Sequence, residues 1–273
     1  MRLRASCTLE FESERESPIV LMLRARPGAA QRLIEEKLEV GANLPVTSFT
    51  DLFGNVCDRF VAPRGPLAIR SEITAEVSPG VAVEHSAART PIAKMPHTAL
   101  HFTLPSRYCP SDKLQKLALE VTRGATPGYG EVRAVRDHVH ARLAYRYGVS
   151  NGSTDALETL EMGAGVCRDF AHVAIALCRS IDIPARMVAG YLHRRDPMDL
   201  HAWFEAYVGG RWYTFDATED ELRGGRLVLA YGRDAADVAF MTDYGALTLR
   251  RMEVEVQERV ASSEGRAPLR ATG

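Results

Sequence analysis

The sequence GAGVCRDFAHVAIALC (residues 163–178) contains two cysteines within one stretch of helical character. Apolar residues recur along it at the spacing of a single helix face: Val166, Phe170, Val173, Ala174, Leu177, Cys178 and Ile181. Pro184 follows and cannot continue a helix. We therefore predict a helix packed against a core, with Cys178 as a small apolar residue inside that core.

Cys167 has a different position, in the first turn of the predicted helix. Several backbone N–H groups there have no partner within the helix, and the helix dipole is positive. A thiolate is stabilised at such a place, and the same N–H groups can bind the oxyanion formed when a thiolate attacks a carbonyl. Helix starts also hold unreactive cysteines, so the position alone leaves both interpretations open.

A base and a carboxylate that would suit this thiol lie downstream, in DLHAWFEAYVGGRWYTFDAT (residues 199–218). Side chains alternate on both sides of the Gly-Gly pair at 209–210, which predicts two antiparallel strands joined by a two-residue turn. In that register His201 and Asp216 share one face as diagonal neighbours, close enough for their side chains to meet. The carboxylate would then hold one imidazole nitrogen and leave the other for the thiol. A slip of one residue would place them on opposite faces.

The rest of the chain divides by composition and pattern. Two early stretches, LPVTSFTDLFGNVCDRFVAP (44–63) and LAIRSEITAEVSPGVAV (67–83), show short extended segments separated by turn signals, as in a β-sandwich. Helical spacing begins after a proline-containing junction. The predicted organisation is a β-rich N-terminal domain over 1–104, a linker over 105–112, a catalytic domain over 113–260 and a flexible tail over 261–273.

Composition narrows the function classes. Among 273 residues, 34 are Lys or Arg and 35 are Asp or Glu, so the net charge of -1 gives no strong field for nucleic acid or an anionic membrane. Neither a signal peptide nor a membrane span is evident. Five scattered cysteines without a CxxC pair argue against a disulfide framework and a structural zinc site. We therefore expect a protein of the reducing cytoplasm.

The order Cys, His, Asp carries a family resemblance. GVCRDFAHVAIALCRSIDIPARMVAGY (165–191) followed by the His-Asp hairpin resembles the transglutaminase-like superfamily of papain-type cysteine enzymes. TDLFGNVCDRF (50–60) and YGRDAADVA (231–239) resemble the N-terminal domain and a downstream segment of its bacterial members. The resemblance implies an α+β core in which helices pack on an antiparallel sheet, after a β-sandwich-like N-terminal domain. It also implies Cys167 as nucleophile, His201 as base and then acid, and Asp216 as the orienting residue, without metal or cofactor.

Two departures from the family pattern concern the oxyanion site. Arg168 stands where relatives often have Gln after the nucleophile. Relatives also use an upstream Gln or Trp as a second oxyanion donor, but both tryptophans of this chain lie downstream. Tyr145, Tyr147 and Asn151 are the candidates for that donor.

Other polar and aromatic residues near the motifs have structural interpretations. Asp169 lies in the first helical turn, where a negative charge interacts favourably with the helix dipole. We therefore expect a structural rather than a catalytic role for it. Trp203 either shields the His-Asp pair or lines the cleft, and Glu205 on the same face suits a salt bridge. His172 is expected to be structural, and His193 to be exposed in a loop beside Arg194 and Arg195.

Three functions remain open at this point. The leading one is a cysteine peptidase or amidase that hydrolyses a peptide, a protein or a small amide through an acyl-enzyme. The second is a transglutaminase, which passes the acyl group to an amine instead of water. The third is a non-catalytic binding module on the same core. The β-rich domain offers a surface for packing, substrate presentation or homo-oligomer contact.

Overall fold

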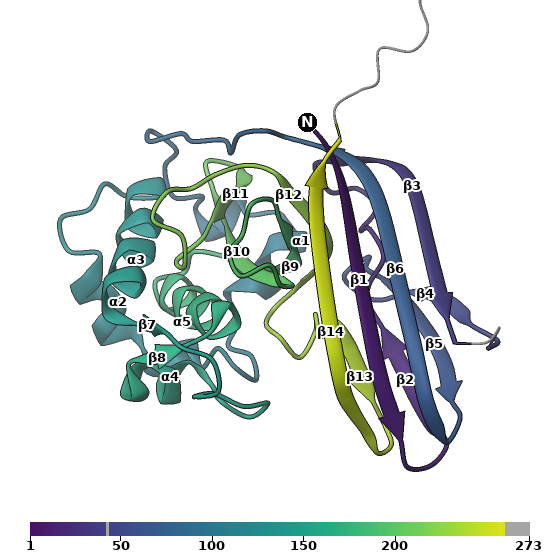
Figure 1. The fold of residues 1–273 in the computed structure, drawn as a ribbon. Coiled ribbons are helices and arrows are strands. Elements are labelled where there is room, and N and C mark those ends of the chain that lie inside the picture. Colours follow the sequence, from purple (N-terminus) through teal and green to yellow (C-terminus); the bar gives the residue numbers. More distant parts are fainter. Residues whose placement is uncertain (42–43, 260–273) are drawn as a thin grey trace, which may run out of the picture.

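Two groups of elements lie side by side in the computed structural model, which describes residues 1–41 and 44–259 (Figure 1). One group consists of long antiparallel strands, and the other combines helices with a smaller antiparallel sheet. The fold is therefore α+β. No helix within the described residues is both long and apolar enough to cross a membrane.

The strand group forms two four-stranded sheets. The first has the order β14-β1-β6-β3, with β14 (Leu247–Glu258), β1 (Arg2–Ser13), β6 (Gly65–Val77) and β3 (Gln31–Val40). The second has the order β13-β2-β5-β4, with β13 (Met241–Asp243), β2 (Ser17–Leu21), β5 (Val56–Ala62) and β4 (Thr47–Thr50). Strand β1 alternates strictly between buried and partly exposed residues, as expected where one face covers a core. Buried residues of both sheets form one apolar cluster, so the group is sandwich-like.

The helical group surrounds α5 (Cys167–Ser180). Before it come η1 (Ile92–Lys94), α1 (His97–Leu100), η2 (His101–Thr103), η3 (Ser111–Lys113), α2 (Gln115–Val121), α3 (Tyr129–Arg142), β7 (Ala144–Tyr145), α4 (Ala156–Met162) and β8 (Ala164–Gly165). After it, β9 (Ala185–Leu192), β10 (His201–Val208), β11 (Arg211–Phe215) and β12 (Arg226–Gly232) form a sheet of order β11-β10-β9-β12.

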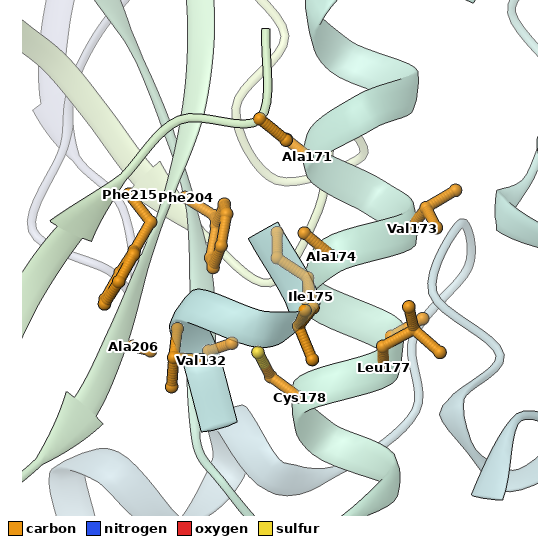
Figure 2. Packing of buried hydrophobic residues seen from close by; sticks show 14 of the residues in the cluster. Val132, Ala171, Val173, Ala174, Ile175, Leu177, Cys178, Phe204, Ala206 and Phe215 are labelled. Carbon is orange, nitrogen blue, oxygen red and sulfur yellow. The ribbon is translucent and has the colours of Figure 1, made fainter. Parts of the chain in front are cut away.

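Helix α5 is the centre of the second core. Figure 2 shows its apolar residues packed against Phe204 and Phe215 of the sheet and Val132 of α3. Cys178 is fully buried among them, which confirms its interpretation as a core residue. Burial on nearly every side fixes the helix, and with it the position of its first residue.

The hairpin register predicted from the Gly-Gly turn is confirmed. Phe204 pairs with Phe215 and Val208 with Arg211, and the even-numbered face of β10 packs on α5. Strand pairing ends at Phe215, so Asp216 approaches His201 from the loop that follows β11.

The C-terminal strands differ from the expected organisation. The catalytic domain expected over 113–260 includes residues 241–258, but β13 pairs with β2, and β14 pairs with β1 from Leu3 to Ser13. Without β14, the long strand β1 would leave one edge of backbone groups unpaired, and the last strand supplies those partners. The predicted flexible tail, 261–273, lies outside the described residues.

Candidate active site

The start of α5 is held in place by a short parallel strand pair. Helix α4 ends at Gly163 in the left-handed conformation, with φ of 65°, and β8 follows at once. Strand β7 binds alongside it through Ala144 N–H to Gly163 O at 2.9 Å and Arg146 N–H to Gly165 O at 2.9 Å. This pairing brings Tyr145 next to the chain that leads into Cys167.

Asp169 acts on this segment as a structural residue. Its fully buried carboxylate accepts hydrogen bonds from Val166 N–H at 2.9 Å, the Ser150 hydroxyl at 2.5 Å and the Arg168 side chain at 2.9 Å. A Cβ at Gly165 would lie 2.6 Å from the Asp169 Cβ, so glycine is needed for this carboxylate to pack against the turn. Arg168 therefore forms an ion pair with Asp169. This pair gives a structural reason for an arginine directly after Cys167.

His201 and Asp216 form a buried pair. The Nε2 atom of His201 lies 2.7 Å from Asp216 Oδ2, and both residues are almost completely inaccessible to solvent. The other carboxylate oxygen accepts the backbone N–H and the hydroxyl of Thr218 at 3.0 and 2.8 Å. These bonds orient the carboxylate and leave His201 Nδ1 buried without a hydrogen-bond partner of good geometry. That nitrogen is the one available to a thiol or a substrate.

Electrostatics favour an ionised thiol beside a protonated imidazole. Burial of Cys167 opposes ionisation, but the neighbouring His201 imidazole, the positive charge of Arg195 and the N–H of Ala202 lower the pKa of the thiol below its usual value. Burial of His201 opposes protonation, yet Asp216 and Cys167 together raise the pKa of its imidazole. Burial likewise disfavours the Asp216 carboxylate, and the charges of His201 and Arg226 hold its pKa well below the ordinary range.

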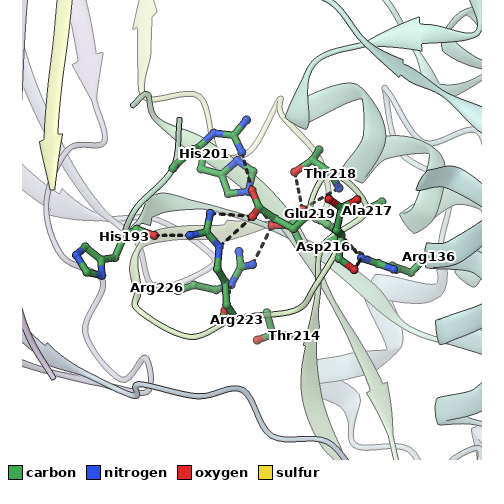
Figure 3. A network of polar contacts seen from close by, with 12 residues as sticks. Arg136, His193, His201, Thr214, Asp216, Ala217, Thr218, Glu219, Arg223 and Arg226 are labelled. Atoms are coloured by element: carbon green, nitrogen blue, oxygen red, sulfur yellow. Dashed lines mark hydrogen bonds and ion pairs between the residues drawn. The ribbon is translucent and has the colours of Figure 1, made fainter. Parts of the chain in front are cut away.

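Arg226 is a member of the site that the sequence analysis missed. Its Nη2 atom lies 2.9 Å from Asp216 Oδ2, and only 7% of its side chain is exposed (Figure 3). Its guanidinium also lies over the Trp203 ring, 4.9 Å from the ring centre. A buried cation thus compensates the carboxylate on which His201 depends. No sequence motif identifies Arg226 as a residue of the site. The order of the strands in the folded sheet determines that β12 brings Arg226 to Asp216.

Arg195, which the sequence places beside His193 in a loop, is buried in the structure. Only 7% of its side chain is exposed, and it pairs with Glu219 at 3.1 Å and donates a hydrogen bond to the Tyr145 hydroxyl at 2.9 Å. The positive charge of Arg195 favours the Cys167 thiolate. In turn, after the larger effect of burial, the negative charge of Cys167 raises the pKa of Tyr145, so the phenol stays protonated near the sulfur.

Trp203 supports His201 from the side of the sheet opposite α5. Its ring is 1% exposed and its centre lies 5.9 Å from that of His201. A Cβ at Gly190, the residue paired with His201 on β9, would clash with the backbone oxygen of Leu227 and lie 2.9 Å from the Trp203 ring, so glycine leaves room for both β12 and the indole. Of the two interpretations of Trp203, the structure favours shielding of the His-Asp pair. Glu205 forms a largely buried salt bridge with Arg186 at 2.6 Å.

The remaining candidate residues lie away from the sulfur or are occupied elsewhere. Asn151 uses its side chain to accept the N–H and hydroxyl of Ser153. Tyr147 is 56% exposed. His172 is buried against Tyr108 and accepts the Ala235 N–H at 3.1 Å, and burial lowers its pKa to about 3, so it is neutral and structural. His193 is partly exposed.

Cys167 and His201 share a cavity of about 380 Å³. Its walls are mainly apolar, and methionines from both element groups contribute to them: Met22, Met187, Met241 and Met252. The half-buried carboxyl of Asp199 also lines this cavity, and burial raises its pKa. An open, mostly apolar space beside a polarised thiol is suited to a substrate with an uncharged reacting group. Within residues 1–41 and 44–259, no cluster of three or more His, Cys, Asp or Glu could hold a metal ion.

Comparison with known proteins gives a consistent result. A family model described as the transglutaminase-like superfamily matches residues 115–217. A solved structure from Cytophaga hutchinsonii, named as a "Putative Cysteine Protease", is 32% identical and superposes with a TM-score of 0.87, covering 94% of this chain and 90% of that chain. An uncharacterised protein of Mycobacterium leprae is 29% identical over 237 residues, which cover 80% of this chain and 82% of that protein. An uncharacterised protein of Mycobacterium tuberculosis is also 29% identical, over 79% of this chain and 77% of its own length.

These matches define the class of protein, an α+β protein with the transglutaminase-like fold. The likeness to the Cytophaga structure extends over both element groups and includes the N-terminal sheets. The chain belongs to the transglutaminase-like superfamily.

Proposed function

We propose that this protein is a cysteine hydrolase of amide or peptide bonds, with Cys167 as nucleophile, His201 as acid and base, and Asp216 as the residue that orients His201. The observation that carries the proposal is the buried contact of 2.7 Å between His201 and Asp216, beside a thiol whose pKa is lowered. The proposal is also supported by the cavity lined by Cys167 and His201, the second of which contacts Asp216. The name of the Cytophaga relative is consistent with this activity.

The first half of the reaction forms an acyl-enzyme. The Cys167 thiolate attacks the carbonyl carbon, a C–S bond forms, and the carbonyl electrons move onto oxygen. When that oxyanion collapses, the C–N bond breaks and His201 donates its proton to the departing amine nitrogen. The amine leaves, and a thioester on Cys167 remains.

The second half returns the enzyme to its starting state. Neutral His201 takes a proton from water, and the resulting hydroxide adds to the thioester carbonyl. Collapse of this second oxyanion breaks the C–S bond, releases the carboxylic acid and regenerates the Cys167 thiolate beside protonated His201. Asp216 keeps the same imidazole nitrogen throughout, so the ring does not have to turn between the two halves.

The oxyanion would be bound at the start of α5. Among the described residues, the backbone N–H groups of Cys167 and Arg168 form no hydrogen bond, although Val166, Asp169 and Phe170 all do. Two free N–H groups at the positive end of a helix are suitable donors to an oxyanion. We assign the Tyr145 hydroxyl as an additional, side-chain donor to the oxyanion, because its raised pKa keeps it protonated.

A screen of peptide, isopeptide and small-amide libraries tests the proposal. Mass spectrometry detects the acyl-enzyme on Cys167. Wild type should release amine and carboxylic acid, and Cys167→Ala should release neither. Cys178→Ala is the matched control, because it removes a cysteine from the core of the same helix without touching the site. Addition of a primary amine to the assay distinguishes hydrolysis from transfer of the acyl group to an amine. Incorporation of the amine without acid release would identify a transglutaminase, and activity in Cys167→Ala would reject the nucleophile.

A further inference from the structure

A second cavity lies on the face of the β9–β10–β12 sheet that points away from α5. Its volume is about 610 Å³, within the usual range for small-molecule sites. Gly28 and Gly80, from two loops of the N-terminal part of the chain, also line it. It shares no lining residue with the cavity of Cys167, so the two spaces are separate.

The walls of this cavity carry an excess of positive charge. Four arginines line it, Arg26, Arg186, Arg211 and Arg226, against a single acidic side chain, Glu205. Glu205 pairs with Arg186 at 2.6 Å, and Arg226 pairs with Asp216 behind the wall at 2.9 Å. Within the described part of the chain, Arg26 and Arg211 form no salt bridge with an acidic residue. These two guanidinium groups therefore have no carboxylate of the described residues within ion-pair distance.

Arg26 is held rigidly in this position. Its Nη2 donates to Phe53 O at 2.6 Å, and its guanidinium carbon lies 4.6 Å from the centre of the Tyr231 ring. Arg186 also lies over Tyr231, at 3.7 Å. Burial lowers the pKa of Arg26, and so does the nearby charge of Arg186, while Tyr231, Asp51 and Glu205 oppose this change.

The wall also presents unsatisfied hydrogen-bond donors. Trp203 Nε1 and Arg226 Nη1 are buried and have no hydrogen-bond partner in the described residues. Buried donors without acceptors are costly, so this wall is short of hydrogen-bond acceptors as well as of negative charge. Guanidinium groups suit planar or tetrahedral oxyanions because they donate two hydrogen bonds in a fixed fork.

We propose that this cavity is a binding site for a small oxyanion-bearing ligand, a carboxylate or a phosphate, held between the guanidinium groups of Arg26 and Arg211. The site is distinct from the one at Cys167. The binding itself does not depend on the activity proposed for Cys167.

Calorimetric titration of the full-length protein tests the proposal, with inorganic phosphate in one arm and succinate in the other. We expect saturable binding of at least one of the two anions. Binding of phosphate alone would indicate a phosphate ligand, and binding of succinate alone would indicate a carboxylate ligand. Arg26→Gln and Arg211→Gln should each weaken binding at least tenfold. Because Arg211 is exposed, its variant keeps the test valid if Arg26→Gln fails to fold. Arg64→Gln, an exposed arginine outside the cavity, should bind as wild type does.

A second titration separates this site from the catalytic one. Protein alkylated at Cys167 with iodoacetamide should bind the same anion with an affinity within about twofold of unmodified protein. Three results would overturn the proposal: no heat of binding in either arm, equal affinity in both arginine variants and wild type, or binding abolished by alkylation.

Discussion

The reactivity of one sulfur atom depends on residues from three separate segments. Cys167 begins α5, while His201 begins β10, Arg195 precedes that strand and Ala202 offers its backbone N–H. Burial alone would raise the pKa of a thiol, as it does for Cys109, where the pKa is raised to about 12. At Cys167 the charges and hydrogen bonds outweigh burial. The two cysteines differ in their charged neighbours and also in exposure, since Cys167 is partly exposed and Cys109 is fully buried.

Arg195→Gln should weaken this effect at Cys167. Removal of the buried positive charge should raise the pKa of the thiol by about one unit, an ordinary effect of one charge at close range. The rate of iodoacetamide alkylation against pH measures the shift. Arg194→Gln changes an exposed neighbour and should leave the profile unchanged. If both variants match wild type, Arg195 has no part in activating the thiol.

Asp216→Asn should destabilise the fold at neutral pH. The change leaves Arg226 buried without its counterion, which costs about 3 kcal/mol in typical cases. The folded pKa of Asp216 is depressed, so its contribution is fully present above the unfolded value of about 4 and is lost as the pH falls toward the folded pKa. Urea unfolding at pH 7 and pH 3 measures this. The advantage of wild type over the variant should shrink at pH 3, and a constant advantage would contradict the account.

At the scale of elements, the start of α5 is fixed by a turn that tolerates no side chain at Gly165. Gly165→Ala should force the Asp169 carboxylate away from the turn, because the added Cβ would lie 2.6 Å from the Asp169 Cβ. We expect a loss of about 1–3 kcal/mol of stability, typical of overpacking, and slower alkylation of Cys167. Thermal unfolding and alkylation rates provide the measurements. Gly80→Ala, outside the cavity of Cys167, adds a Cβ with no atom within 4 Å and should be nearly neutral, and equal effects of the two variants would refute this role of Gly165.

The elements that local patterns specify were predictable. The apolar spacing of α5 and the Gly-Gly turn of the β10–β11 hairpin are short-range signals, and together they place His201 and Asp216 on a shared face. Arg226 and Arg195 were not predictable in the same way. Their burial depends on which strands become neighbours in the sheet and on how a loop folds over the site, and a single sequence does not display either.

At the scale of the whole molecule, the strand group forms part of the active-site cavity. Met241 belongs to β13 and Met252 to β14, and both line the space in front of Cys167. The sequence analysis placed these strands in the catalytic domain because they follow it directly in the chain. Their pairing with β1 and β2 is a contact between distant parts of the sequence, which no local pattern reveals.

Met252→Ala therefore tests whether the strand group contributes to substrate binding. Once a substrate is known, the variant should raise KM several-fold with little change in kcat, because an apolar wall contact is lost and the reacting groups are untouched. Steady-state kinetics measures the change. Met162→Ala, at an exposed methionine outside the cavity, should behave as wild type. A KM equal to that of wild type in both variants would mean that β14 has only a structural role.

The reactivity of the Cys167 thiol, followed as its iodoacetamide alkylation rate between pH 5 and pH 10, tests the central claim most directly. In native wild type, mass spectrometry should find the label at Cys167 alone, since Cys7, Cys57, Cys109 and Cys178 are buried. The reaction should remain fast at about pH 6.5, where an ordinary thiol with a pKa of about 8.5 is only ~1% ionised. In His201→Ala this fast reaction at low pH should disappear. A wild-type profile centred near pH 8.5, or identical profiles for wild type and His201→Ala, would contradict the account.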